Sequence, residues 1–96
     1  MKERKTFEKA AFELIAMRFI LEADVETKRE FATFEDTPPA ILAKLAEDKD
    51  VFVLENVATN PNTPITSLAE LVEFEGYHVS KYARENLKSR TKKVHD

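Results

Sequence analysis

The sequence predicts an all-α fold in which short helical units stack side by side. Residues 2–22 form a helical pattern that neither Gly nor Pro interrupts, and the chain then repeats itself with a period of 26 residues. Thr-Pro and Asn-Pro pairs mark the boundaries of that period. With 96 residues, 43% of them apolar and 34% charged, the chain suits one domain without a spanning helix, which needs about 20 apolar residues.

The N-terminal helix carries apolar residues that wrap more than one stripe toward its end: Phe7, Ala11, Leu14, Ile15, Met17, Phe19, Ile20 and Leu21. We therefore expect this helix to be covered on more than one side or to share a face with another molecule. Its charged start leads into an amphipathic stretch containing Glu13 and Arg18, which argues against a secretory signal and favours a cytoplasmic protein.

Charge is distributed unevenly along the chain. Residues 1–9 carry four Lys/Arg against two Glu, residues 10–77 carry five against fourteen acids, and residues 78–96 carry six against two. A nucleic-acid-binding domain is expected to have a basic face, so the acidic middle makes nucleic acid an unfavourable partner except at the ends.

The period is clearest between residues 37 and 88. Five residues recur identically 26 positions later: Leu42, Ala43, Leu45, Glu47 and Val53 fall on Leu68, Ala69, Leu71, Glu73 and Val79. Upstream, Ala16 and Phe19 take the places of Leu42 and Leu45, so the first helix ends as a degenerate copy.

The turns explain why the period is structural. Pro61 disfavours helical geometry at Asn60, so one helix ends there. Thr63 can cap the next helix with its hydroxyl while Pro64 occupies the first helical position, and Thr37 and Pro38 repeat this arrangement. Asp50 is placed to cap the second helix of its unit.

A unit of this size cannot bury its apolar faces alone and must stack on its neighbours, which is the physical basis of a helical solenoid. We predict a single helical-repeat domain over residues 1–90, composed of an N-terminal capping helix (1–21), a partial repeat (about 22–36) and two repeats (37–62 and 63–88). A basic flexible tail is predicted over residues 91–96.

Residues 37–64 resemble the leucine-rich repeat variant, a HEAT-like family with a Thr-Pro, Leu-x-x-Leu-Ala-x-Asp-x-Asp, Val-x-x-x-Val-Ala-x-Asn-Pro pattern. The resemblance covers roughly residues 22–88 and implies alternating α- and 3₁₀-type helices in a right-handed superhelix. This chain has Leu54 and Ser80 where the family often has Arg, and Phe52 and His78 where it has polar residues. One member of the family is associated with an iron–sulfur cluster, but a chain without cysteine cannot inherit that association.

The sequence gives no sign of catalysis, metal or cofactor. Only two histidines are present, and Ser80 near His78 has no third partner. The single Gly76 excludes glycine-rich phosphate loops, and zero cysteines exclude thiolate chemistry. We expect no catalytic, cofactor-binding or metal residue and predict that the chain is not an enzyme.

Four large apolar residues break the expected polar pattern: Phe52, Leu54, Phe74 and Tyr77. Exposed together, they would form a patch that binds a protein partner; alternatively, the first helix or the last turn covers them. We predict a non-enzymatic protein-interaction or scaffold module with a partner of unknown identity, in which a homo-oligomer is possible.

The competing function is nucleic-acid binding through the basic C-terminal region. Residues 68–87 also read as a helix-turn-helix, although Glu73, Glu75 and Glu85 would face phosphate badly. The residues that would contact nucleic acid in this alternative are Lys81, Arg84, Lys88, Arg90, Lys92 and Lys93.

Overall fold

The computed structural model describes the backbone of residues 2–95 and the side chains of residues 11 and 13–91. Six α-helices and no strands make up the described chain, which confirms the all-α prediction. The helices are α1 (Lys2–Leu21), α2 (Val25–Thr33), α3 (Pro39–Leu45), α4 (Val51–Thr59), α5 (Ile65–Leu71) and α6 (Tyr77–His95).

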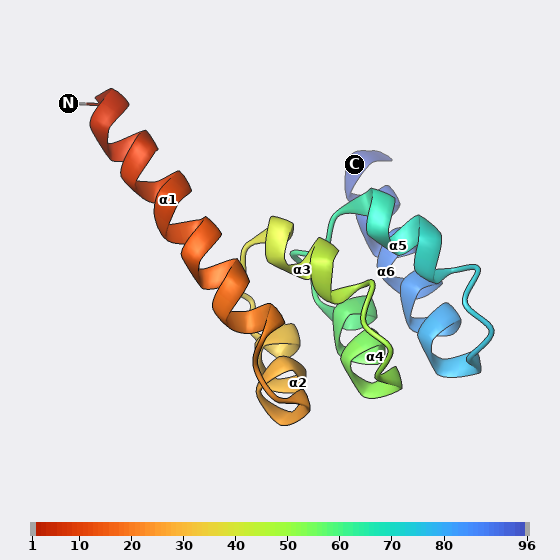
Figure 1. Cartoon of the computed structure of the whole chain (residues 1–96). Coiled ribbons are helices and arrows are strands. Elements are labelled where there is room, and N and C mark those ends of the chain that lie inside the picture. Colours follow the sequence, from red (N-terminus) through yellow and green to blue (C-terminus); the bar gives the residue numbers. More distant parts are fainter. Residues whose placement is uncertain (1, 96) are drawn as a thin grey trace.

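The helices form a thin body with dimensions of 44 × 38 × 17 Å. Helices α2, α4 and α6 lie side by side with α4 in the middle, and α3 and α5 pack beside them (Figure 1). Helix α1 packs on α2 and α3 near its C-terminal end, while its N-terminal half projects away from the other helices (Figure 1).

The ends of the helices follow from local side-chain chemistry. Asp24 and Asp50 precede α2 and α4 in extended geometry, and their carboxylates accept hydrogen bonds from the N–H groups of Thr27 and Val53, both at 2.9 Å. Asn60 ends α4 in extended geometry directly before Pro61, as the sequence predicts. The prediction that Asp50 caps its helix is therefore confirmed.

The predicted role of the two threonines is wrong. The hydroxyls of Thr37 and Thr63 donate to the carbonyls of Phe31 and Val57, at 2.6 and 2.7 Å, and these carbonyls belong to the preceding helices. The following residues, Pro38 and Pro64, occupy the cap position of α3 and α5 with ψ 145° and no side-chain cap. Each threonine instead adds a second hydrogen bond to a carbonyl near the end of the preceding helix, which already accepts the N–H of Phe34 or Asn60.

Asparagines tie neighbouring helix ends together. The buried Asn60 amide donates to the carbonyls of Ala32 and Phe34, both at 2.8 Å, and its side-chain oxygen accepts from the N–H of Asn62 at 2.8 Å. Asn86, 26 residues later, donates in the same way to the carbonyls of Ala58 (2.9 Å) and Asn60 (3.0 Å). Carbonyls at the C-terminal ends of α2 and α4 thus accept hydrogen bonds from asparagine side chains at the end of α4 and on α6.

The core runs through the middle of the body and is centred on α4. Its largest fully buried side chains are Ile41, Leu42, Leu45, Leu68, Val53, Val57, Val79 and Thr63. Because α4 lies between α2 and α6, it buries residues on more than one face: Val53, Leu54, Val57 and Ala58 are all in the core.

Two features differ from the predictions. The resemblance implied alternating α- and 3₁₀-type helices, but all six helices of residues 2–95 are α-helices. Helix α6 also continues to His95, beyond residue 90, at which the sequence predicted the helical-repeat domain to end. Asp96 and the side chains of residues 92–95 lie outside the described residues.

Candidate functional site

An apolar groove of about 630 Å³ lies at the N-terminal end of the molecule, between α1 and the segment that joins α2 to α3. One wall comes from Ile15, Ala16, Phe19 and Ile20 of α1. The rest comes mainly from Phe31, Phe34, Pro38 and Ile41. Glu13 and Asp36 also line the groove, so its charged side chains are acidic.

The wall on α1 exposes residues of the kind that belong to a core. Ile15 and Phe19 are 71% and 67% exposed, whereas Ile41 and Leu45, 26 positions later on α3, are each 1% exposed. Helix α3 packs on α1, α2 and α4, but α1 lies at the end of the body. The exposure of Ile15 and Phe19 therefore follows from the absence of a further helix over α1 within the described chain.

Hydrogen bonds fix the opposite side of the groove. Phe34 leaves α2 in extended geometry, with its N–H bonded to the Phe31 carbonyl at 3.3 Å, and the two rings meet edge to face with centroids 5.5 Å apart. The hydroxyl of Thr37 and the amide of Asn60 bond the carbonyls of Phe31 and Phe34. The groove therefore has a rigid aromatic side that the next turn of the chain holds in place.

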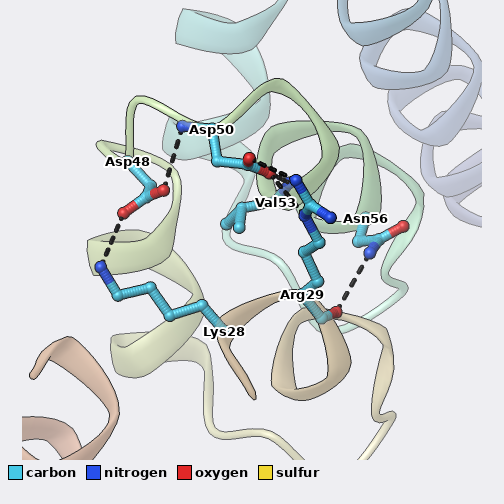
Figure 2. A network of polar contacts seen from close by, with 6 residues as sticks. All are labelled: Lys28, Arg29, Asp48, Asp50, Val53 and Asn56. Carbon is cyan, nitrogen blue, oxygen red and sulfur yellow. Dashed lines mark hydrogen bonds and ion pairs between the residues drawn. The ribbon is translucent and has the colours of Figure 1, made fainter. Parts of the chain in front are cut away.

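A polar network joins α2 to α4 and to the turn that precedes α4 (Figure 2). Arg29 forms a two-bond ion pair with Asp50 (Nε to Oδ1 3.0 Å, Nη2 to Oδ2 2.7 Å), and Lys28 pairs with Asp48 at 3.1 Å. Asp48 also accepts the N–H of Asp50 at 3.0 Å, and Asn56 donates to the Arg29 carbonyl at 3.0 Å. Every one of these groups has a protein partner, so the network positions α2 against α4 and offers no free ligand set.

The ion pair changes the acidity of its carboxylate. The hydrogen bonds from Arg29 are the main cause that lowers the pKa of Asp50 to about 2, and the Val53 N–H adds to the effect. Asp50 is thus charged at any pH near neutrality. It caps α4 and holds α2 at the same time.

Three of the four apolar residues of the predicted patch are exposed, and one is buried. Leu54 is 2% exposed and belongs to the core, so its assignment to an exposed patch is wrong. Phe52, Phe74 and Tyr77 are exposed, but the Arg29 guanidinium lies 4.8 Å from the Phe52 ring centroid, and the Lys81 ammonium lies 5.8 Å from that of Tyr77. Leu54 was misassigned because α4 is buried on two faces, which its own four-residue pattern does not reveal.

The basic residues of the nucleic-acid alternative all lie on α6. Arg84 and Lys88 are exposed and Lys81 is half-buried, whereas Lys92 and Lys93 have side chains outside the described residues.

Arg90 is engaged within the protein. It donates to the carbonyl of Thr63 and to that of Pro61 (2.7 Å), and its Nε donates to the Asn86 side chain at 3.2 Å. Burial lowers the pKa of Arg90 from its ordinary value. The carbonyl of Thr37, the counterpart of Thr63 one period earlier, likewise accepts a side-chain hydrogen bond, from Asn62. Arg90 therefore serves as a structural donor and is not available for phosphate in this conformation.

The sequence reasoning missed the residues of the groove. Two signals pointed toward them: the apolar residues of the first helix wrap beyond one stripe, and Phe31 and Phe34 stand where Val57 and Asn60 stand in the next unit. The groove itself depends on the angle between α1 and α3, which no local pattern specifies.

No known protein family, curated protein or solved structure matches this chain. The resemblance to the leucine-rich repeat variant therefore stays a prediction from the sequence. Within the described residues, no group of three or more His, Cys, Asp or Glu side chains is placed to hold a metal ion, and none of the helices there is long and apolar enough to cross a membrane.

Proposed function

We propose that this protein is a non-enzymatic interaction module that docks an apolar helical segment of a protein partner in the groove beside α1. The observation that carries the proposal is the exposure of Ile15 and Phe19 against a fixed aromatic side formed by Phe31 and Phe34. A groove of this kind suits an amphipathic helix, which inserts side chains spaced three or four residues apart.

We propose in addition that the scaffold is a short right-handed solenoid of HEAT-like, leucine-rich-repeat-variant type. Three features support this view. Helices α2, α4 and α6 begin 26 residues apart, α3 and α5 do the same, and the Asn60 and Thr37 contacts recur at Asn86 and Thr63. In a solenoid the terminal units have only one neighbour, which accounts for an unfilled apolar surface at the N-terminal end. A cysteine-free sequence fits a cytoplasmic location.

Capture experiments test the groove as the docking surface. Tagged wild-type protein and the Ile15→Glu/Phe19→Glu variant are used to capture proteins from a native extract after mild cross-linking, with quantitative mass spectrometry as the readout. Both residues are exposed, so the variant keeps the fold. We expect specific partners to be depleted about tenfold or more, because charges replace two apolar anchors.

The matched control is Ile65→Glu, which places one of these charges on another exposed isoleucine, on α5 and outside the groove. It should capture partners as well as the wild type does. Equal capture by the groove variant and the control would rule out the groove as the docking surface.

A salt-dependent mobility shift with DNA or RNA tests the competing function, since binding through Arg84 and Lys88 would weaken steeply as salt is added.

A further inference from the structure

The occupant of the groove can be narrowed by chemistry. The exposed residues Ile15 and Phe19 require apolar side chains opposite them, and Glu13 and Asp36 of the lining favour a segment that carries positive charge. The best-fitting ligand is therefore a helix that is both apolar and basic.

The chain itself contains such a helix. The first half of α1, residues 2–12, has four basic residues against two acidic ones and carries the apolar residues Phe7, Ala10, Ala11 and Phe12. This half of α1 projects beyond the other helices (Figure 1). Residues 13–20 of the same helix form one wall of the groove. Helix α1 therefore provides both part of the groove and, in its first half, a projecting segment of complementary charge.

We infer that the occupant is a second copy of this chain, with the two α1 helices antiparallel about a twofold axis. The basic N-terminal half of each α1 then lies along the acidic groove of the other copy. Such a contact is isologous and closes at two copies, because each chain gives one helix and receives one. The inference rests on the proposed function of the groove as a protein-docking surface and names its partner.

The length of α1 sets the contact that a pair can make. Helix α1 has 20 residues and is therefore about 30 Å long. Specific interfaces bury about 800 Å² per partner, so a stable pair needs contact along the length of both helices and in both grooves. The pairing also covers Ile15 and Phe19, which the monomer leaves in water.

Light scattering on the purified full chain tests the inference without any other protein present. We expect a mass of twice the 11.0 kDa chain, with a dissociation constant that rises at least about tenfold in Ile15→Glu/Phe19→Glu. Ile65→Glu should behave as the wild type. A wild type that stays monomeric at every concentration, or a groove variant that dimerises as tightly as the wild type, overturns the inference.

Reversing the charges tests the antiparallel arrangement. One variant makes the groove basic (Glu13→Lys/Asp36→Lys), and the other makes the projecting half acidic (Lys5→Glu/Lys9→Glu). Each variant alone brings like charges together at both contacts and should lose the dimer, whereas a mixture restores opposite charges at both and should form heterodimers. Failure of the mixture to recover dimers while each variant remains folded by circular dichroism contradicts the arrangement.

The outcomes separate the inference from the proposed function. A monomer that still captures other proteins through Ile15 and Phe19 rules out the second copy and leaves the groove as a docking surface. A dimer that responds to the charge reversals supports the inference, whatever an extract contains.

Discussion

The two interfaces of α4 occupy equivalent positions of the chain but use different chemistry. Toward α2, the contact includes two ion pairs, Lys28 with Asp48 and Arg29 with Asp50, beside the buried Ala32 (Figure 2). Toward α6, the residues 26 positions later are Leu54, Glu55, Phe74 and Gly76, and Leu54 is buried in the core. The same helix arrangement therefore accepts ion pairs on one side of α4 and a buried apolar residue on the other. We infer that its stability comes mainly from what both sides share, which is the core and the asparagine hydrogen bonds.

This comparison predicts that truncating a side chain lowers the free energy of unfolding more at the interface with α6 than at the interface with α2. Leu54→Ala should reduce the free energy of unfolding by about 2–5 kcal/mol, because it leaves a cavity in the core. Lys28→Ala, at the equivalent position of α2, should cost about 1 kcal/mol, because the ion pair is only partly buried and Asp48 keeps the hydrogen bond from the Asp50 N–H. Urea unfolding of both variants measures the difference. Equal costs would show that the two interfaces contribute alike.

Besides the all-α class, the sequence could predict the roles of some turn residues. Asn60 before Pro61 and Asp50 before Val51 act locally, so their roles can be inferred from neighbouring residues alone. The threonine hydroxyls could not be assigned in the same way. The Thr37 hydroxyl can bond either the helix before it or the helix after it. In the folded loop it donates to the Phe31 carbonyl of the preceding helix.

The candidate site was not predictable for a different reason. Leu54 was expected at the surface because one helical face of α4 accounts for Val53 and Val57, but a second neighbour covers Leu54 as well. Ile15 and Phe19 have the opposite history. They stand at positions whose counterparts are buried in α3, and only the place of α1 at the end of the body leaves them exposed. Whether a helix lies in the middle or at the end of the body depends on the tertiary fold, and the burial of its residues depends on that position.

A second prediction concerns the effect of acid on the polar interface between α2 and α4. The pKa of Asp50 is about 2 in the folded protein and has an ordinary value of 3.8. A carboxylate with a lowered folded pKa stabilises the protein above its unfolded pKa, and this contribution is lost as pH falls from about 4 toward 2. Asp50→Asn retains a good helix cap but removes the charge, so it should lose less stability on acidification than the wild type.

Urea unfolding at neutral pH and near pH 2 measures this difference. The control is Leu54→Ala, which changes the apolar interface without removing a titratable group and should have the acid dependence of the wild type. An Asp50→Asn variant that loses as much stability in acid as the wild type would contradict the role of the ion pair.

The smallest expected effect concerns the missing cap of α6. Gly76 accepts the first helical hydrogen bond of α6 from Ser80, as Asp50 does for α4 from Leu54, but it has no side chain to cap the helix. A Cβ atom at Gly76 would lie 2.9 Å from Cε2 of Phe74, so the ring occupies the space that an aspartate needs. Gly76→Asp in a Phe74→Ala background should therefore gain a few tenths of a kcal/mol, or about 1–2 °C in melting temperature.

The control in that background is Gly76→Ala, which adds a Cβ atom without a capping oxygen and should not gain stability. Gly76→Asp with Phe74 present should gain less than in the Phe74→Ala background, because the ring must move. An equal gain in both backgrounds would mean that Phe74 does not exclude the cap. Phe74 and Gly76 are the counterparts of Asp48 and Asp50, 26 residues later. A gain that depends on removing Phe74 would show that an apolar residue at the first position excludes an aspartate at the second. The polar and the apolar interface of α4 would then be two alternative ways to fill the same geometry.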